Sequence, residues 1–119
     1  MKDFRELKVW EKAHRFVLGV YRSSQSFPAD ERFGLTAHLR KSVVSITSNI
    51  AEGCGRETDK DFARFLIIAA GSASEAEYRI LLAKDLGYLS DSSYEDLDSK
   101  VNEVKRMLNS LIQTLNQTS

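Results

Sequence analysis

The sequence predicts an all-α protein: an antiparallel up-down-up-down four-helix bundle that assembles into a homo-oligomer. Apolar residues recur at steps of three and four along four segments, which is the period of an α-helix. The one proline, Pro28, and most of the six glycines fall near the expected ends of those segments. No segment shows the alternation of a half-buried strand, and three short connections make successive helices antiparallel neighbours.

The first two helices are expected over residues 7–24 and 29–53. The apolar stripe of the first is formed by Leu7, Trp10, His14, Val17 and Tyr21, flanked by Val9, Ala13, Phe16 and Val20. Pro28 ends this segment, because proline disfavours a helical residue before it. Asp30 and Glu31 after Pro28 predict the start of the second helix, since acidic side chains favour the positive end of the helix dipole. Gly53 is its expected end.

The third and fourth helices are expected over residues 58–86 and 92–116. Thr58, with Asp61 three residues later, resembles a capping box, and Gly87 follows the third helix. Ser92 and Glu95 form a full S-x-x-E capping box, so they predict the start of the fourth helix. A heptad of apolar residues then follows: Leu97, Val101, Val104, Leu108, Leu111 and Leu115.

The composition bounds the class of protein. A chain of 119 residues that is 42% hydrophobic and 29% charged can bury one core, so we expect a single domain over residues 1–119. The 17 basic and 17 acidic residues cancel, so net charge by itself indicates neither a nucleic acid nor a membrane. The charged N-terminal segment has no signal-peptide core, and no run approaches the roughly 20 apolar residues of a membrane helix. With a lone cysteine, these features predict a cytoplasmic protein with no membrane partner.

The segment Gly53-Cys54-Gly55-Arg56 is the short stretch that most resembles a site. A phosphate-binding loop needs G-x-x-x-x-G-K-[ST] after a strand, and neither the strand nor the lysine is present. Cys54 beside Arg56 has the neighbour of a reactive thiol, but no base motif accompanies it. We interpret the segment as a bend in which the glycines adopt positive φ, and we predict no catalytic residue and no cofactor.

The sequence does not favour a metal centre. Di-metal bundles use two E-x-x-H motifs and two further glutamates. This chain has one such motif, Glu11 to His14, whereas Leu35 stands three residues before His38. His14 also lies on the apolar stripe, where a hydrogen-bonded core histidine is the more common outcome.

Five cations of the first helix form a candidate nucleic-acid-binding surface, which we call the basic ridge: Arg5, Lys8, Lys12, Arg15 and Arg22. Their spacing places them along one line of the helix, and such a line can follow a phosphate backbone. The alternatives are a solvated outer face, or ion pairs with the acidic fourth helix. Charge runs on amphipathic helices more often face water.

Two features predict contact with another helix or another copy of the chain. A polar stripe on the second helix consists of Ser42, Ser45, Asn49 and Glu52. It suits either an exposed face or hydrogen bonds to a neighbouring helix. On the third helix, Phe65, Leu66, Ile67 and Ile68 point in directions about 100° apart, so they cannot all face one core. The candidate oligomer interface is therefore the polar stripe with Phe65, Ile67 and Ile68.

Four elements, in this order, resemble the small four-helix-bundle family named after intervening sequences of 23S ribosomal RNA genes: LKVWEKAH, FPADERFGLTAHLRKSVVSITSNIAEGCGR, FARFLIIAAGSASEAEY and LLAKDLGYL. The family signature falls on Ser48, Asn49, Ile50, Ala51, Glu52, Gly53, Gly55 and Arg56. The resemblance implies a bacterial, cytosolic, pentameric bundle without known enzymatic activity. A related branch is similar to the accessory proteins of diversity-generating retroelements, which engage nucleic acid and a reverse transcriptase through a basic surface.

The leading functional hypothesis is a non-enzymatic, oligomeric scaffold or adaptor that associates with RNA or DNA through the basic ridge. The alternative is a protein-binding assembly partner with no nucleic-acid role. A metal-binding bundle is the third hypothesis.

Overall fold

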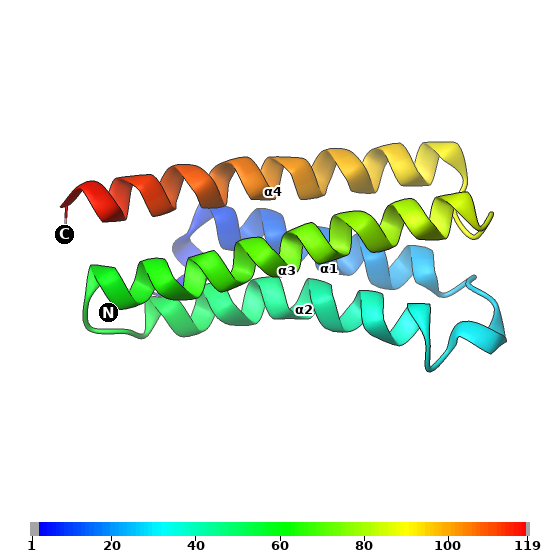
Figure 1. Cartoon of the computed structure of the whole chain (residues 1–119), viewed down its shortest axis with the longest axis horizontal. Helices are drawn as coiled ribbons and strands as arrows, with labels where there is room; N and C mark the ends of the chain where they lie inside the picture. Colours follow the sequence, from blue (N-terminus) through cyan, green and yellow to red (C-terminus); the bar gives the residue numbers. More distant parts are fainter. Residues whose placement is uncertain (1–2, 119) are drawn as a thin grey trace.

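Four long α-helices account for most of residues 3–118, the part of the chain that the structure describes (Figure 1). In this computed structural model α1 spans Lys8–Ser24, α2 Leu35–Cys54, α3 Asp59–Asp85 and α4 Asp91–Thr118. Two short 3-10 helices, η1 at Phe4–Glu6 and η2 at Ala29–Glu31, precede α1 and α2. Residues 3–118 contain no β-strand, which confirms the prediction of an all-α protein with four helices.

The helices lie side by side along the 45 Å axis of the molecule (Figure 1). α2 packs against α3, α3 packs against α4, and α1 packs against both α2 and α4. Partners along α2 and α3 follow in opposite chain order, because Ser45 contacts Ser72 whereas the earlier His38 contacts the later Arg79. The contacts of α4 with α1 and with α3 reverse in the same way.

One hydrophobic core runs through the bundle and receives side chains from every helix. The largest fully buried side chains are Phe16, Val20, Leu39, Val43, Ile46, Ile50, Leu66, Ile80, Leu97, Val101, Val104 and Leu108. Burial of a side chain of this size stabilises the fold by about 1.5–3 kcal/mol. On α1 the buried stripe is rotated from the expected one, since Trp10 and His14 are half-buried and Tyr21 is exposed. These three side chains carry polar atoms, which remain near water at the edge of the core.

The second helix begins at Leu35, later than the predicted residue 29. Pro28 precedes only the short η2, and Gly34 interrupts the helical backbone with φ −104° and ψ −113°. Glu31 caps α2 from outside, because its Oε1 accepts a hydrogen bond from the Leu35 N–H at 3.1 Å. Its Oε2 accepts a hydrogen bond from the Tyr88 hydroxyl at 3.1 Å. The acidic residue does assist the start of α2, but from the end of η2, which it also ties to Tyr88 in the connection between α3 and α4.

The prediction of positive φ at the glycines of the Gly53–Arg56 segment is wrong. α2 continues through Cys54, its C-cap Gly55 has φ −82°, and the positive φ in the described residues belongs to Gly87, at 82°. Gly53 is required for space instead. A Cβ atom at Gly53 would lie 2.9 Å from Cδ1 of Phe62 and 3.0 Å from Cβ of Phe65. The glycine therefore allows α2 and α3 to approach closely just before the connection between them.

Side-chain caps define the starts of the last two helices. The Thr58 hydroxyl accepts a hydrogen bond from the Asp61 N–H at 3.1 Å, as the capping box at α3 predicts. The fourth helix starts earlier than predicted, at Asp91, and the Ser90 hydroxyl accepts the hydrogen bond from the Ser93 N–H at 3.1 Å. The cap of α4 is therefore Ser90, because Ser92 already lies inside the helix.

Candidate functional site

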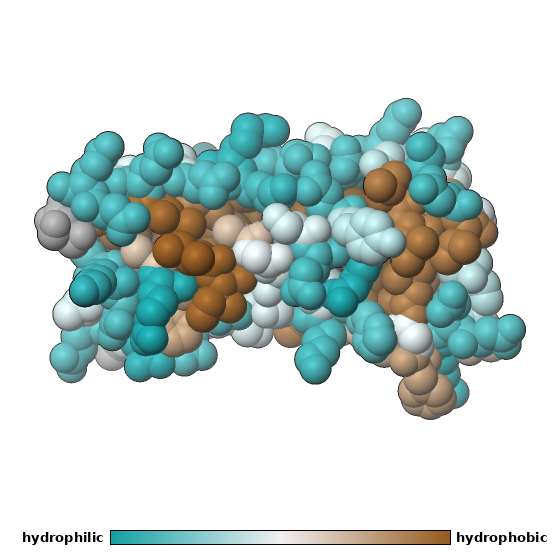
Figure 2. Space-filling view, viewed as in Figure 1, coloured by the Kyte–Doolittle hydropathy of each residue, from teal (hydrophilic) through white to brown (hydrophobic). Residues whose placement is uncertain are grey.

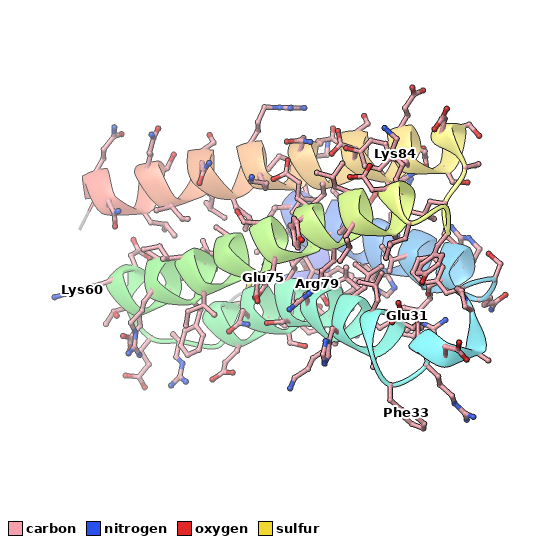
Figure 3. All side chains as sticks on the ribbon, turned by 45° about the vertical axis from the view of Figure 1, so that its right-hand side comes forward. Glu31, Phe33, Lys60, Glu75, Arg79 and Lys84 are labelled. Atoms are coloured by element: carbon pink, nitrogen blue, oxygen red, sulfur yellow. The ribbon has the colours of Figure 1, made fainter. Side chains whose placement is uncertain are left out.

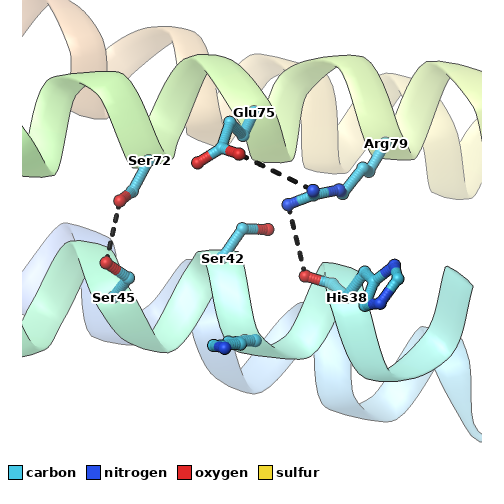
Figure 4. A pocket seen from close by; sticks show the side chains of 7 residues that line it. His38, Ser42, Ser45, Ser72, Glu75 and Arg79 are labelled. Carbon is cyan, nitrogen blue, oxygen red and sulfur yellow. Dashed lines mark hydrogen bonds and ion pairs between the residues drawn. The ribbon is translucent and has the colours of Figure 1, made fainter. Parts of the chain in front are cut away.

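A polar groove follows the line where α2 meets α3 (Figure 4). It has a volume of about 290 Å³ and is lined by His38, Lys41, Ser42, Ser45, Ser72, Glu75 and Arg79. Arg79 forms an ion pair with Glu75 at 3.6 Å and donates a hydrogen bond to the His38 carbonyl at 3.4 Å. Figure 3 shows Glu75 and Arg79 beside each other above α2. The arginine of this groove is therefore already neutralised by a carboxylate of its own helix.

The polar stripe of α2 borders this groove, and its side chains already have partners within the chain. Buried Ser42 donates to the Leu39 carbonyl at 2.8 Å. Ser45 and Ser72 share a hydrogen bond of 2.8 Å between α2 and α3, and Asn49 donates to the Ser45 carbonyl at 2.8 Å. The last member of the stripe, Glu52, is exposed. The stripe thus changes from a helix contact at Ser45 to an exposed surface at its end.

The outer side of α3 carries exposed apolar side chains, which we call the α3 face: Ile67, Ile68, Tyr78 and Leu81. Ile67 is 55% exposed, Ile68 48% and Tyr78 59%, whereas Leu66 is fully buried and Phe65 half-buried. Figure 2 shows apolar surface over α3 in two areas that polar atoms separate. Of the three α3 residues predicted at an interface, Ile67 and Ile68 thus lie in the open.

Ion pairs neutralise most of the basic ridge. The pairs join Arg5 to Asp3 at 3.0 Å, Lys12 to Glu103 of α4 at 3.6 Å, and Arg15 to Glu11 at 3.1 Å. The Arg5 hydrogen bond also lowers the pKa of the Asp3 carboxyl. Lys8 and Arg22 form no ion pair with the described residues, and both are exposed. The ridge therefore combines the two alternatives that the sequence left open, namely ion pairing with α4 and solvated charge.

Residues 48–56, the segment that carries the family signature, form the junction of α2 with α3. Ile50, Gly53 and Cys54 are buried. The Arg56 guanidinium pairs with Glu52 at 2.8 Å and lies 4.6 Å from the centre of the Phe65 ring. The segment therefore joins two helices by packing, and the buried Cys54 is the last residue of α2 rather than part of an open turn.

The His14 side chain takes part in a structural contact, whereas the exposed His38 contributes its backbone carbonyl to the Arg79 hydrogen bond. The His14 ring stacks on Trp10, with ring centroids 4.8 Å apart and 9° between the planes.

Within residues 3–118, no group of three or more His, Cys, Asp and Glu side chains is arranged to hold a metal ion. Among the described helices, none has the length and apolar character needed to cross a membrane.

The sequence pattern did not predict that Phe33 is an exposed aromatic residue. Phe33 is 84% exposed and projects from the loop between η2 and α2 (Figure 3). The Arg32 guanidinium lies 5.5 Å from the centre of its ring. Periodicity assigned both residues to the second helix, so it gave no sign of this loop. The neighbouring Gly34 was the available signal.

Comparison with known proteins shows how the chain is related to other proteins, which its side chains alone do not. The family model described as "23S rRNA-intervening sequence protein" matches residues 5–110. The chain belongs to this family. It is also similar to a crystal structure of a protein with unknown function from the S23 ribosomal protein family of Bacteroides thetaiotaomicron. The two are 26% identical with a TM-score of 0.80, over 87% of this chain and 97% of that chain. No curated protein matches the chain. The family resemblance is confirmed, and the family comes without an assigned activity.

Proposed function

We propose that this 23S rRNA-intervening sequence protein is a non-enzymatic cytoplasmic scaffold or adaptor that works as a homo-oligomer. Each subunit is one domain, an antiparallel up-down-up-down bundle, which the reversed order of its interhelical contacts supports. The observation that carries the proposal is the α3 face. Exposed apolar side chains that gather in two areas along one helix are typical of a surface that another protein covers.

A second copy of this chain fits the α3 face for two reasons. Gly71 lies within it, and a Cβ atom at Gly71 would meet nothing within 4 Å, so another helix can approach closely there. The neighbouring polar stripe has its hydrogen bonds formed within the chain, from Ser42, Ser45 and Asn49. Covering these groups therefore costs less than covering polar groups without partners, because an unpaired buried donor is the main cost of burying polar surface.

The size of the surface indicates how much must be covered. A stable interface buries about 800 Å² on each partner. α3 has 27 residues, so it is about 40 Å long, and a strip about 10 Å wide along it offers roughly 400 Å². A neighbouring subunit must therefore also cover the flanks, including the polar stripe of α2 and the half-buried Phe65. We propose five subunits, the number that the family resemblance implies.

Light scattering or sedimentation equilibrium at micromolar concentration tests this proposal. The wild-type protein is expected as a species several times heavier than the 13.5 kDa chain. Ile67→Glu places a charge on the α3 face and should shift the protein toward the single chain. The matched control is Leu18→Glu, since Leu18 is 43% exposed on α1, which packs on α2 and α4.

Three outcomes decide the matter. A wild-type protein of 13.5 kDa would show that no self-association occurs, and the α3 face would then favour a different protein partner. A wild-type dimer would contradict only the number five. Equal dissociation by Ile67→Glu and Leu18→Glu would place the interface elsewhere.

Binding of RNA or DNA along the basic ridge is a second candidate function. The observation in its favour is that Lys8 and Arg22 are exposed and have no ion pair with the described residues. Arg5, Lys12 and Arg15 would have to exchange carboxylate partners for phosphates. Such an exchange lowers the net free energy gained on binding a nucleic acid, because the existing ion pairs are lost.

A salt titration of RNA binding tests the ridge. Each phosphate contact contributes about one unit to the slope of log affinity against log salt. Changing Lys8 and Arg22 together to Gln should lower the slope by about two units. A slope that stays the same in this double variant, or no binding by the wild-type protein, would contradict a nucleic-acid role for the ridge.

A further inference from the structure

A second groove lies at one end of the molecule, between the end of α1 and the start of α2. Its volume is about 410 Å³. The polar part of its lining comes from Ser24, Gln25, Thr36, Arg32 and Arg40, and no acidic residue lines it. A groove with two arginines and no carboxylate is a region of concentrated positive charge in a chain whose net charge is zero.

Arg40 is held in place but keeps free donors. Its Nε donates to the Ser24 hydroxyl at 2.8 Å, its Nη2 donates to the Tyr21 carbonyl at 3.3 Å, and the guanidinium lies 4.7 Å from the centre of the Tyr21 ring. A guanidinium has five N–H donors, so these two bonds leave several available. No described carboxylate forms an ion pair with Arg40. The side chain is thus oriented in advance for an anion.

Arg32 is the second cation of the groove and forms no ion pair or side-chain hydrogen bond with the described residues. The nearest acidic residues along the chain are Asp30 and Glu31. Neither lines the groove, and Glu31 is engaged by Leu35 and Tyr88 instead. The α2–α3 groove differs in this respect, since its arginine already faces a carboxylate.

Thr36 adds an unsatisfied hydroxyl to the same groove. The residue is only 9% exposed, and its Oγ1 has no hydrogen-bond partner among the described residues. Buried hydroxyls without a partner are rare, and each one calls for an explanation. The Oγ1 atom itself is closed to solvent, so a ligand oxygen would supply the missing acceptor after a small shift of the Thr36 side chain toward the groove.

We propose that this groove binds a small phosphate monoester. The two guanidiniums match a phosphate group, because it carries close to two negative charges at neutral pH and accepts paired hydrogen bonds from arginine. The groove is larger than a phosphate alone and falls in the size range of small-molecule sites. Phe27, Pro28 and Ala29 form its apolar wall, on which the organic group of the ester lies. The site is separate from the α3 face and does not depend on self-association.

Calorimetric titration with phenyl phosphate, inorganic phosphate and benzoate tests this assignment. We expect saturable binding of one phenyl phosphate per chain, weaker binding of inorganic phosphate, and still weaker binding of benzoate. Arg32→Gln should weaken phenyl phosphate binding at least about tenfold, the usual effect of losing a charged hydrogen bond. Among the described residues the Arg32 side chain contacts the exposed Phe33 ring and forms no ion pair or hydrogen bond, so the variant should melt close to the wild-type temperature.

The control is Arg106→Gln, which removes an exposed arginine of α4 that forms no ion pair with the described residues. Binding by this variant should stay within about twofold of wild type, since a distant surface charge is screened by salt. Three results would overturn the proposal: no saturable binding of phenyl phosphate, an equal loss in the two variants, or benzoate binding as tight as that of phenyl phosphate.

Discussion

Gly53→Ala should destabilise the protein, although alanine is the better helix former. Gly53 lies inside α2, where replacing glycine by alanine normally stabilises a helix by about 0.5–1 kcal/mol. Here the new Cβ would lie 2.9 Å from Cδ1 of Phe62, 3.0 Å from Cβ of Phe65 and 3.3 Å from the Phe62 carbonyl oxygen. The ring of Phe62 can rotate, but the other two atoms are fixed to the backbone of α3. The two helices must therefore move apart.

The expected magnitude follows from two opposing terms. Overpacking in a well-packed core costs about 1–3 kcal/mol, and the propensity gain offsets part of it. We expect a net loss of about 1–2 kcal/mol. For a domain of this size, each kcal/mol lowers the melting temperature by about 3–5 °C.

Gly71→Ala is the matched control when both substitutions are made in the Ile67→Glu background, where no neighbouring subunit covers α3, because Gly71 is a helical glycine with open space around it within its own chain. It should gain about 0.5–1 kcal/mol, so the two substitutions should move the melting temperature in opposite directions. Thermal unfolding followed by circular dichroism measures both at one protein concentration, since association also stabilises. A Gly53→Ala protein that melts at or above the wild-type temperature would refute the close-approach argument.

Two further substitutions test polar groups. Thr36→Val removes the unpartnered hydroxyl and should raise the free energy of unfolding, measured in denaturant, by about 1 kcal/mol. The control Thr47→Val should not, because the Thr47 hydroxyl donates a hydrogen bond to the Val44 carbonyl at 3.0 Å. Equal effects of the two would contradict this explanation. The hydrogen bond to Glu31 raises the pKa of Tyr88 in the folded protein. The stability that this hydrogen bond contributes is therefore complete below the ordinary tyrosine pKa and is lost as the pH rises through the pKa of Tyr88 in the folded protein. Glu31→Gln should lower the pKa of Tyr88, and superimposable phenolate absorbance titrations of wild type and variant would disprove the assignment.

The helices could be predicted because their signals are local. Apolar spacing and a Thr58 cap are properties of short segments, so α1 and α3 could be placed closely from the sequence. The start of α2 could not, because Glu31 caps it through a side chain whose other oxygen is bonded to Tyr88, far along the chain. Pro28 and the acidic residues after it fit the start of a long helix at residue 29 as well as they fit the start of the short η2. The backbone conformation at Gly34 separates η2 from α2 and so decides for the second outcome.

The candidate surfaces were predictable only in part, for the same reason. The pairing of Arg15 with Glu11 follows from the i,i+4 spacing, whereas the pairing of Lys12 with Glu103 depends on which helix lies next to α1. The exposure of Ile67 follows from helical geometry once the inner side of α3 is known. The polar stripe of α2 indicated one wall of the α2–α3 groove, but the facing residues Ser72, Glu75 and Arg79 and the groove around Arg32 and Arg40 depend on how the helices pack.

The family signature has a physical explanation that moves the search for function elsewhere. Within residues 48–56, Ile50 and Gly53 face the interior, and Arg56 closes the junction over the Phe65 ring. The Gly53 contact with α3 requires a residue without a side chain, and the Arg56–Glu52 pair holds the chain as it turns. Ile50, Gly53 and Arg56 are thus occupied in making the fold, whereas Asn49 and Glu52 also belong to the polar stripe. The other groups available to a partner lie outside the signature, on the α3 face and around Arg32 and Arg40, so we expect relatives with different partners to differ on those two surfaces.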